Sequence, residues 1–287
     1  MVFGKESVNL SRLVPVVEET PDFQRLVDHL VQSGGENIAV LPPAARPYVV
    51  AALHRRLAKP LLVIVPTSEE AQGFFGQLLA WCDESASPVL FPEPDALPYE
   101  QLAPDSFIAQ QRVQILARLV RTETDAGASH LPPLVVGPAG AIVRKTMSCR
   151  TFVAASHVLT VGMCVDPFEL MGKWIDIGYE STGLVEVPGT FGHRGGILDV
   201  YPPNSDLPAR IEFFGNEVES IRLFDPHTQR SLKALSAVEV IPAREASTNS
   251  VDTVMDYLPA DSLVIVIEPG NVEASIVELD VQAAQVR

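Results

Sequence analysis

The sequence has few of the features that mark secreted or membrane proteins. It contains three cysteines, Cys82, Cys149 and Cys164, and their spacing fits neither a disulfide framework nor a zinc site. Its longest uninterrupted apolar runs, residues 61–65 and 263–267, are far shorter than the about 20 residues needed to span a bilayer. The N-terminal residues lack the charged and apolar regions of a secretory signal. We therefore expect a cytoplasmic protein with no membrane contact.

Basic residues are also scarce. The 21 lysines and arginines are outnumbered by 36 aspartates and glutamates, which leaves a net charge of -15. This balance argues against non-specific DNA binding, because basic side chains supply most of that affinity by neutralising phosphates. It is compatible with docking to a basic protein surface. The length of 287 residues and the 47% of hydrophobic residues predict a globular chain of roughly two domains.

In the first half of the chain, short apolar runs alternate with helical patterns. Such alternation is typical of βαβ units on a parallel sheet. Thr67 and Glu70 form a capping box that predicts a helix start. We expect strands at residues 38–41, 61–65, 89–91 and 134–136, and helices at residues 47–57, 67–82, 107–119 and 138–147.

The pattern changes near residue 150. A helix capped by Asp166 is followed by a series of short strands that turn-forming residues separate, which predicts an antiparallel meander in a small α+β domain. The expected strands are residues 183–187, 196–201, 209–214, 219–224 and 237–241.

After Pro242, a helix at residues 251–258 and an apolar strand at residues 263–267 return to the first pattern. The fold class is therefore α/β, with one discontinuous parallel-sheet domain at residues 1–148 plus 246–287. A separate α+β domain at residues 149–245 is inserted into it. We expect the strand at 263–267 to rejoin the first sheet.

The loop at residues 41–48 occupies the place where a nucleotide-binding P-loop would lie. A P-loop needs glycines whose N–H groups approach phosphates, followed by Lys and Ser or Thr. Here Pro42, Pro43 and Arg46 stand in a loop without glycine, lysine, serine or threonine. We expect this degenerate loop to hydrolyse no ATP, Arg46 to be solvated, and Glu268 to be a single acidic residue at a strand end.

Acidic and basic side chains cluster in the second half, but their spacing fits no metal or catalytic site. Asp225 is expected to accept backbone N–H bonds in a turn, and Asp199 to meet a basic neighbour. His193 and His227 complete no ligand spacing. We therefore predict no catalytic residue, no metal and no cofactor.

Arg194 stands out because it lies in the glycine-rich segment 189–196 of an acidic chain. A guanidinium between glycines is free to make bidentate contacts with a carboxylate. That carboxylate could belong to a partner protein, or to the sheet that carries Arg194. The residues alone leave both interpretations open.

Residues 189–202 (GTFGHRGGILDVYP) and 210–225 (RIEFFGNEVESIRLFD) resemble, in the same order, a motif shared by bacterial UvrB and the N-terminal part of the transcription-repair coupling factors. Residues 92–102 look like the coupling-factor version, since no tyrosine-rich hairpin of the UvrB kind follows. The resemblance implies a degenerate RecA/P-loop-like domain with an inserted UvrA-binding domain, in a chain that is an N-terminal fragment.

The resemblance also implies a function and a site. The module would recruit UvrA in transcription-coupled excision repair and help to inhibit the full-length factor, an ATP-dependent translocase. RNA polymerase and DNA would be reached only through domains outside this chain. The UvrA-binding residues would be Arg194, Phe191, His193, Tyr201 and Tyr179.

The match to that surface is incomplete, because two further arginines of the family pattern fall on Gly192 and near Ser181. Two other functions remain open. The chain could be a UvrB-type ATP-dependent enzyme, or a structural clamp that packs on other domains of its own protein.

Overall fold

The computed structural model describes residues 9–33, 35–83, 85–94, 106–121, 131–245 and 251–286. The chain divides into two compact units. The first unit comprises Met1–Glu93, Thr122–Val143 and Leu258–Arg287, and the second unit comprises Pro94–Arg121 and Arg144–Tyr257. The second unit is therefore larger than the 149–245 insertion. The domain boundaries expected from the sequence stay a prediction.

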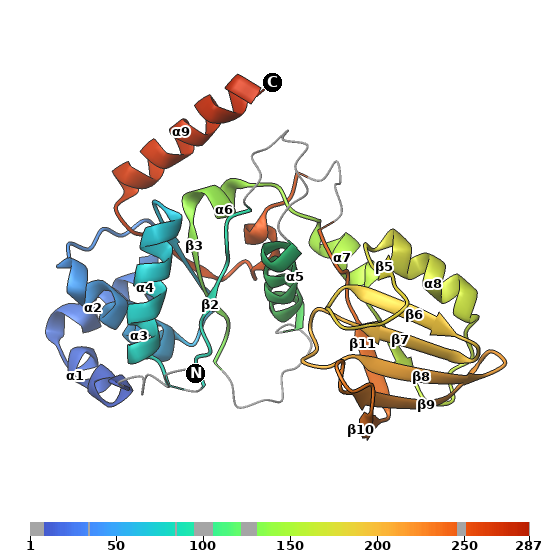
Figure 1. Cartoon of the computed structure of the whole chain (residues 1–287). Helices are drawn as coiled ribbons and strands as arrows, with labels where there is room; N and C mark the ends of the chain where they lie inside the picture. The colour runs from blue at the N-terminus through green and yellow to red at the C-terminus, as the bar shows by residue number, and fades with distance from the viewer. Residues whose placement is uncertain are drawn as a thin grey trace. The chain divides into compact units, whose positions relative to one another are not determined.

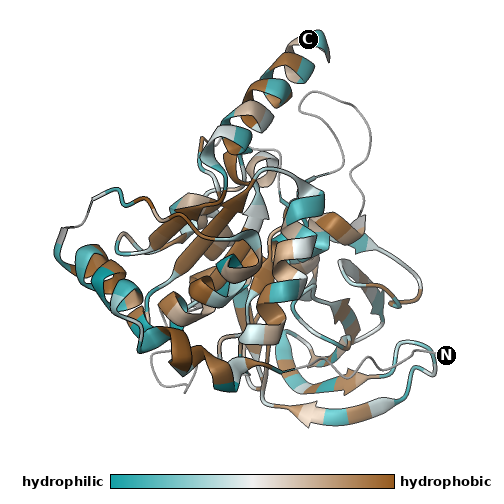
Figure 2. Cartoon of the chain, turned by 90° about the vertical axis from the view of Figure 1, so that its left-hand side faces the viewer, coloured by the Kyte–Doolittle hydropathy of each residue, from teal (hydrophilic) through white to brown (hydrophobic). Residues whose placement is uncertain are grey.

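The first unit is built on a parallel sheet with the strand order β12-β1-β3-β2. Its strands are β1 (Leu61–Val65), β2 (Val89–Leu90), β3 (Leu134–Pro138) and β12 (Leu263–Val266). Figure 2 shows them as apolar ribbons. The central strands β1 and β3 are almost entirely buried, as expected for strands covered on both faces, whereas β12 alternates half-buried and exposed residues. The parallel pairing of β12 with β1 confirms that the late apolar strand rejoins the first sheet.

Helices complete the first unit (Figure 1). Helix α4 begins at the predicted capping box, where the Thr67 hydroxyl accepts a hydrogen bond of 3.2 Å from the Glu70 amide. The helices are α1 (Val14–Glu18), α2 (Pro21–Ser33), α3 (Arg46–Leu57), α4 (Ser68–Trp81), α6 (Ala139–Val143) and α9 (Pro269–Val286), with 3-10 turns η1 (Ser11–Leu13) and η2 (Pro43–Ala45).

The predicted strand at residues 38–41 is wrong. This segment forms no regular structure, and the side chains of Ile38 and Val40 are 87% and 95% exposed. Pro42 and Pro43 follow it directly, and Pro43 opens the 3-10 turn that leads into α3. Apolar composition alone does not place this segment in the sheet, because none of the described strands pairs with it.

The second unit contains a six-stranded sheet with the order β10-β9-β8-β7-β6-β5, antiparallel except for the β5–β6 pair. Its strands are β5 (Glu180–Ser181), β6 (Thr190–Arg194), β7 (Ile197–Tyr201), β8 (Ala209–Phe214), β9 (Glu217–Phe224) and β10 (Ser231–Leu235). This sheet contains three strands of the predicted meander, as β7, β8 and β9. The strand predicted at residues 237–241 is β11, which pairs with β4 outside this sheet.

The remaining elements of the second unit include a two-stranded sheet of β4 (His157–Thr160) and β11 (Ala237–Val240). Its helices are α5 (Ser106–Arg121), α7 (Cys149–Ala155) and α8 (Pro167–Asp176), with the 3-10 turn η3 (Val254–Tyr257). The Asp166 carboxylate accepts the Phe168 amide at 2.8 Å and so caps α8 as predicted. The fully buried Trp174 of α8 belongs to the core that includes Leu198 and Ile211.

Several elements differ from the sequence-based expectation. Residues 183–187 form no strand, and β4, β6 and β10 are not among the strands expected from the sequence. The helix expected at 251–258 is only the turn η3, and the helix expected at 138–147 is only α6. Gly192 in β6 and the charged Lys233 in β10 weaken the strand pattern there. Residues 95–102, part of the coupling-factor-like segment, lie outside the described residues.

Candidate protein-binding surface

The hairpin of β6 and β7 presents the residues on which a binding surface was predicted. Arg194 is paired with Ile197 at the end of the ladder, and Gly195 makes the turn with a φ of 62°, a conformation that glycine adopts without strain. A Cβ atom on Gly196 would lie 3.0 Å from the carbonyl oxygen of Phe213. The glycines therefore permit a tight turn that leaves residues 193–196 exposed.

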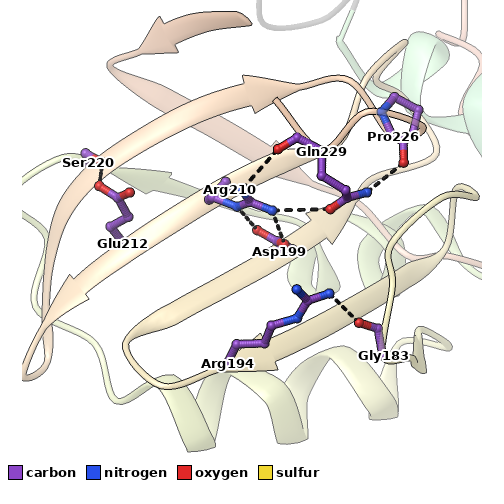
Figure 3. A network of polar contacts seen from close by, with 8 residues as sticks. All are labelled: Gly183, Arg194, Asp199, Arg210, Glu212, Ser220, Pro226 and Gln229. Atoms are coloured by element: carbon purple, nitrogen blue, oxygen red, sulfur yellow. Dashed lines mark hydrogen bonds and ion pairs between the residues drawn. The ribbon is translucent and has the colours of Figure 1, made fainter. Parts of the chain in front are cut away.

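One hydrogen bond holds Arg194 among the residues that the structure describes. Its guanidinium Nη2 donates to the carbonyl oxygen of Gly183 at 2.6 Å (Figure 3). Within the described part of the chain it forms no ion pair with a carboxylate. The bond to Gly183 orients this side chain. A guanidinium has five N–H donors, so donors remain for a ligand.

His193 lies on the opposite face of the same strand, because side chains alternate along β6. Its ring meets Phe168 of α8 edge to face, with ring centroids 5.5 Å apart. Both side chains are exposed. His193 and Arg194 are therefore both accessible, but they belong to different faces of the sheet.

The three aromatic residues of the predicted surface lie in the interior. Phe191, Tyr179 and Tyr201 are only 2%, 3% and 9% exposed. The Phe191 ring packs against Trp174, with centroids 5.6 Å apart. The hydroxyls of Tyr179 and Tyr201 donate to the carbonyl oxygens of Ile241 and Asp206, each at 2.8 Å, and burial raises the pKa of both tyrosines.

These aromatic side chains therefore support the hairpin from within. Of the predicted surface residues, Arg194 and His193 alone present exposed side chains.

Asp199 meets a basic neighbour, as predicted. Its two carboxylate oxygens accept hydrogen bonds of 2.8 Å from Nε and Nη2 of Arg210 (Figure 3). The hydrogen bond with Asp199 raises the pKa of Arg210, and Gln229 takes further N–H groups of the same guanidinium. Asp225 accepts the backbone amides of His227 and Thr228, which confirms the predicted turn. Among the described residues no group of acidic, histidine or cysteine side chains could share a metal ion.

Gly192 explains why one expected cation is missing. A Cβ atom at this position would lie 2.9 Å from the carbonyl oxygen of Thr182 and 3.2 Å from Cγ2 of Val185. The segment that includes Thr182 and Val185 therefore lies directly over β6 and leaves no room for a side chain. The same segment presents the Gly183 carbonyl that binds Arg194.

The degenerate loop of the first unit differs from expectation in one respect. Pro42 precedes the 3-10 turn that Pro43 begins, and Arg46 is not a solvated loop residue. Its guanidinium Nη2 donates to a carboxylate oxygen of Glu268, at the end of β12. The basic side chain of the loop at residues 41–48 is thus paired within the protein.

Comparison with known proteins agrees with the motif in the second half. Residues 158–245 match the family described as the UvrB interaction domain. The chain is 31% identical over 230 residues to the transcription-repair-coupling factor of Bacillus subtilis, which covers 80% of this chain and 19% of that protein.

Two further relatives carry the same name. The factor of Myxococcus xanthus is 33% identical over 78% of this chain and 18% of its own length, and that of Escherichia coli is 25% identical over 73% and 17%. The chain thus spans about a fifth of the length of the relatives it matches. No helix within the described ranges is long and apolar enough to cross a membrane. The matches show a chain related to the N-terminal part of the transcription-repair coupling factors, with a UvrB interaction domain at residues 158–245.

Proposed function

We propose that this chain is a non-catalytic binding module that recruits UvrA in transcription-coupled excision repair. The observation that carries the proposal is the exposed, singly bonded guanidinium of Arg194 on the hairpin of a UvrB interaction domain. The partner would contribute a carboxylate to the N–H groups that Gly183 does not use.

The geometry favours recognition over internal stabilisation. A guanidinium that is already oriented loses less conformational entropy on binding than a free side chain does. Two parallel N–H bonds to a carboxylate are stronger and more directional than neutral hydrogen bonds. The chain has a net charge of -15. An accessible arginine on it therefore provides a local attraction for an acidic partner surface.

Features of the first unit support a role without catalysis. Prolines remove N–H donors from the loop before α3, and Glu268 already occupies the guanidinium of Arg46. ATP-driven translocation and the contacts with RNA polymerase and DNA would then belong to other parts of a longer cytoplasmic factor. A contribution of this module to inhibition of that factor is part of the same proposal.

The test is a binding titration of purified UvrA with variants of the chain. Arg194→Ala should weaken binding by about 2–4 kcal/mol, as expected for loss of one partner of a desolvated charge pair. Arg194→Glu should weaken it further, because repulsion is added. Thermal melts should be unchanged, since the side chain contributes no core contact.

Lys233→Glu is the matched control, because Lys233 is an exposed cation on β10, at the opposite edge of the same sheet. It should bind UvrA as the wild type does. Unchanged affinity of a folded Arg194→Glu variant would contradict the proposed docking site. Absence of UvrA binding by the wild type would instead favour the structural clamp.

A further inference from the structure

A second arginine, Arg244, lies beside Gly178, just before the edge strand β5 of the six-stranded sheet. Gly178 follows α8 with a φ of +95°, and a Cβ atom there would lie 2.5 Å from Cγ and 2.9 Å from Nε of Arg244. Any side chain at position 178 would therefore displace Arg244. The side chain of Arg244 lies against the bare backbone of Gly178, two residues before the edge strand β5 begins.

The neighbours of Arg244 in the sequence fix its backbone. The amide of Ala243 donates to the carbonyl oxygen of Ile177 at 3.0 Å. Glu245 accepts a hydrogen bond of 2.5 Å from Nε of Arg112 and a second bond from the Thr146 hydroxyl. The segment is thus anchored on both sides of position 244.

The charge of Arg244 is not neutralised by this anchoring. The adjacent carboxylate, Glu245, is already bound to the buried Arg112. Arg244 itself is exposed and forms no ion pair with another described residue. Like Arg194, it is a positioned cation on the surface of an acidic chain.

We propose that Arg244 is a second cation of the UvrA-docking surface, in addition to Arg194. We call the edge of the six-stranded sheet that carries both arginines the docking edge. This inference rests on the proposed function and specifies the chemistry of its partner surface. Strand β5 pairs in parallel with β6, with Glu180 opposite Thr190. A straight continuation of this register would place the backbone of Gly178 roughly 20 Å from that of Arg194, at about 3.3 Å per residue.

Glu180 lies between the two arginines and limits what can bind. It is exposed on β5, and its partner Thr190 lies on the same face of the sheet as Arg194, four residues further along β6. A continuous acidic strip on the partner would meet repulsion there. The edge therefore fits a protein that presents two separate carboxylate groups, one for each arginine.

The experiment titrates purified UvrA with the full chain and with the variants Arg244→Glu, Arg194→Glu, their combination, and Lys233→Glu. Arg244→Glu should weaken binding at least tenfold with an unchanged thermal melt, and the combined variant should bind less than either single one. Lys233→Glu should stay within twofold of the wild type. If Arg244→Glu lowers the melting temperature, Arg244→Gln, which keeps a polar stem over Gly178, should still weaken binding at least fivefold.

The outcomes separate this inference from the proposed function. Wild-type affinity of Arg244→Glu together with loss of binding by Arg194→Glu would overturn the role of Arg244 and leave the Arg194 site standing. Failure of the wild-type chain to bind UvrA would overturn both. A parallel titration with duplex DNA in which Arg244→Glu loses affinity, while UvrA binding is unchanged, would overturn the assignment to a protein partner.

Discussion

At the scale of single residues, Asp199 and Arg210 form an ion pair with two hydrogen bonds in the six-stranded sheet. It joins β7 and β8 at directly opposite positions, and Asp199 and Arg210 are only 7% and 18% exposed. The guanidinium also lies over the Phe224 ring, 4.6 Å from its centroid. A buried pair of this kind is costly to break, because the remaining charge keeps its desolvation cost without a partner.

Asp199→Asn should therefore lower the free energy of unfolding by about 3 kcal/mol, near the lower limit for a broken buried pair. Glu212→Gln is the matched control, because Glu212 pairs at 3.3 Å with the more exposed Arg222. Its cost should stay under about 1 kcal/mol, as for exposed pairs. Urea unfolding of both variants measures the difference, and equal costs would show that burial does not set the strength of the Asp199 pair.

His157 makes the second unit sensitive to pH. The indole N–H of Trp174 donates to Nε2 of His157 at 3.0 Å, so this nitrogen must be unprotonated. Burial lowers the pKa of His157, and the charge of Lys173 lowers it further, against the opposing bond to the Ala155 carbonyl. The unfolded chain then binds a proton at a higher pH than the folded chain, so stability must fall as the pH falls.

The melting temperature should decrease as the pH is lowered from about 6.5, the pKa of an unperturbed histidine, through the lower pKa of folded His157. His157→Gln retains an acceptor for Trp174 and removes the titration, so its melting temperature should decrease less over this window. Burial also lowers the pKa of His54, which is present in both the wild type and His157→Gln. The difference between their melting temperatures therefore isolates the effect of His157. Parallel melting curves would contradict this account.

At the scale of elements, sequence patterns were informative where one physical effect dominates. Continuous apolar runs identified β1 and β3, because strands buried on both faces need no polar side. The apolar run of β12 also pairs with β1, although Val264 and Val266 are each 40% exposed. The same reasoning failed at residues 38–41, where apolar side chains stay exposed. An apolar run reports the tendency to be buried and not the presence of a partner strand.

The candidate surface was predictable only in part, for a related reason. Glycines around position 194 indicated an exposed arginine, and exposure follows from the local turn. Burial of Phe191 and Tyr179 depends on α8 and on the strand ends packed against them, which spacing does not reveal. Arg244 was not predicted, because it lies against Gly178, which is 66 residues away in the sequence.

The segment that includes Thr182 and Val185 packs closely on β6, and a substitution at Gly192 tests this packing. Gly192→Ala places a Cβ atom 2.9 Å from a backbone oxygen and 3.2 Å from Val185, so the segment must shift, at a cost of about 1–3 kcal/mol. Gly172→Ala on the exposed side of α8 meets nothing within 4 Å and should be neutral or stabilising by up to about 1 kcal/mol. Denaturant titrations compare the stability of the two variants. Equal stability would show that the segment packs only loosely on β6.

At the scale of the whole molecule, the order of the chain makes completion of the parallel sheet a late event. Strand β1 lies between β3 and β12, and β12 follows the residues 144–257 that belong to the second unit. The β1–β12 contacts therefore join positions about 200 residues apart (Leu61 with Leu263). Contacts this distant carry a high loop-closure cost and form slowly, whereas strands β6 to β10 of the six-stranded sheet pair as consecutive antiparallel hairpins.

This arrangement predicts that damage to the first sheet leaves the second unit folded. Val63→Asp puts an unpaired charge in the fully buried centre of β1, which costs several kcal/mol. Hydrogen exchange should then show lost protection in β1, β3 and β12 but retained protection in β6 to β9, and Arg194-dependent UvrA binding should persist. Val264→Asp, on the half-exposed face of β12, should cause a much smaller loss. Exchange that increases equally in both sheets of the Val63→Asp variant would mean that the two units fold as one cooperative body.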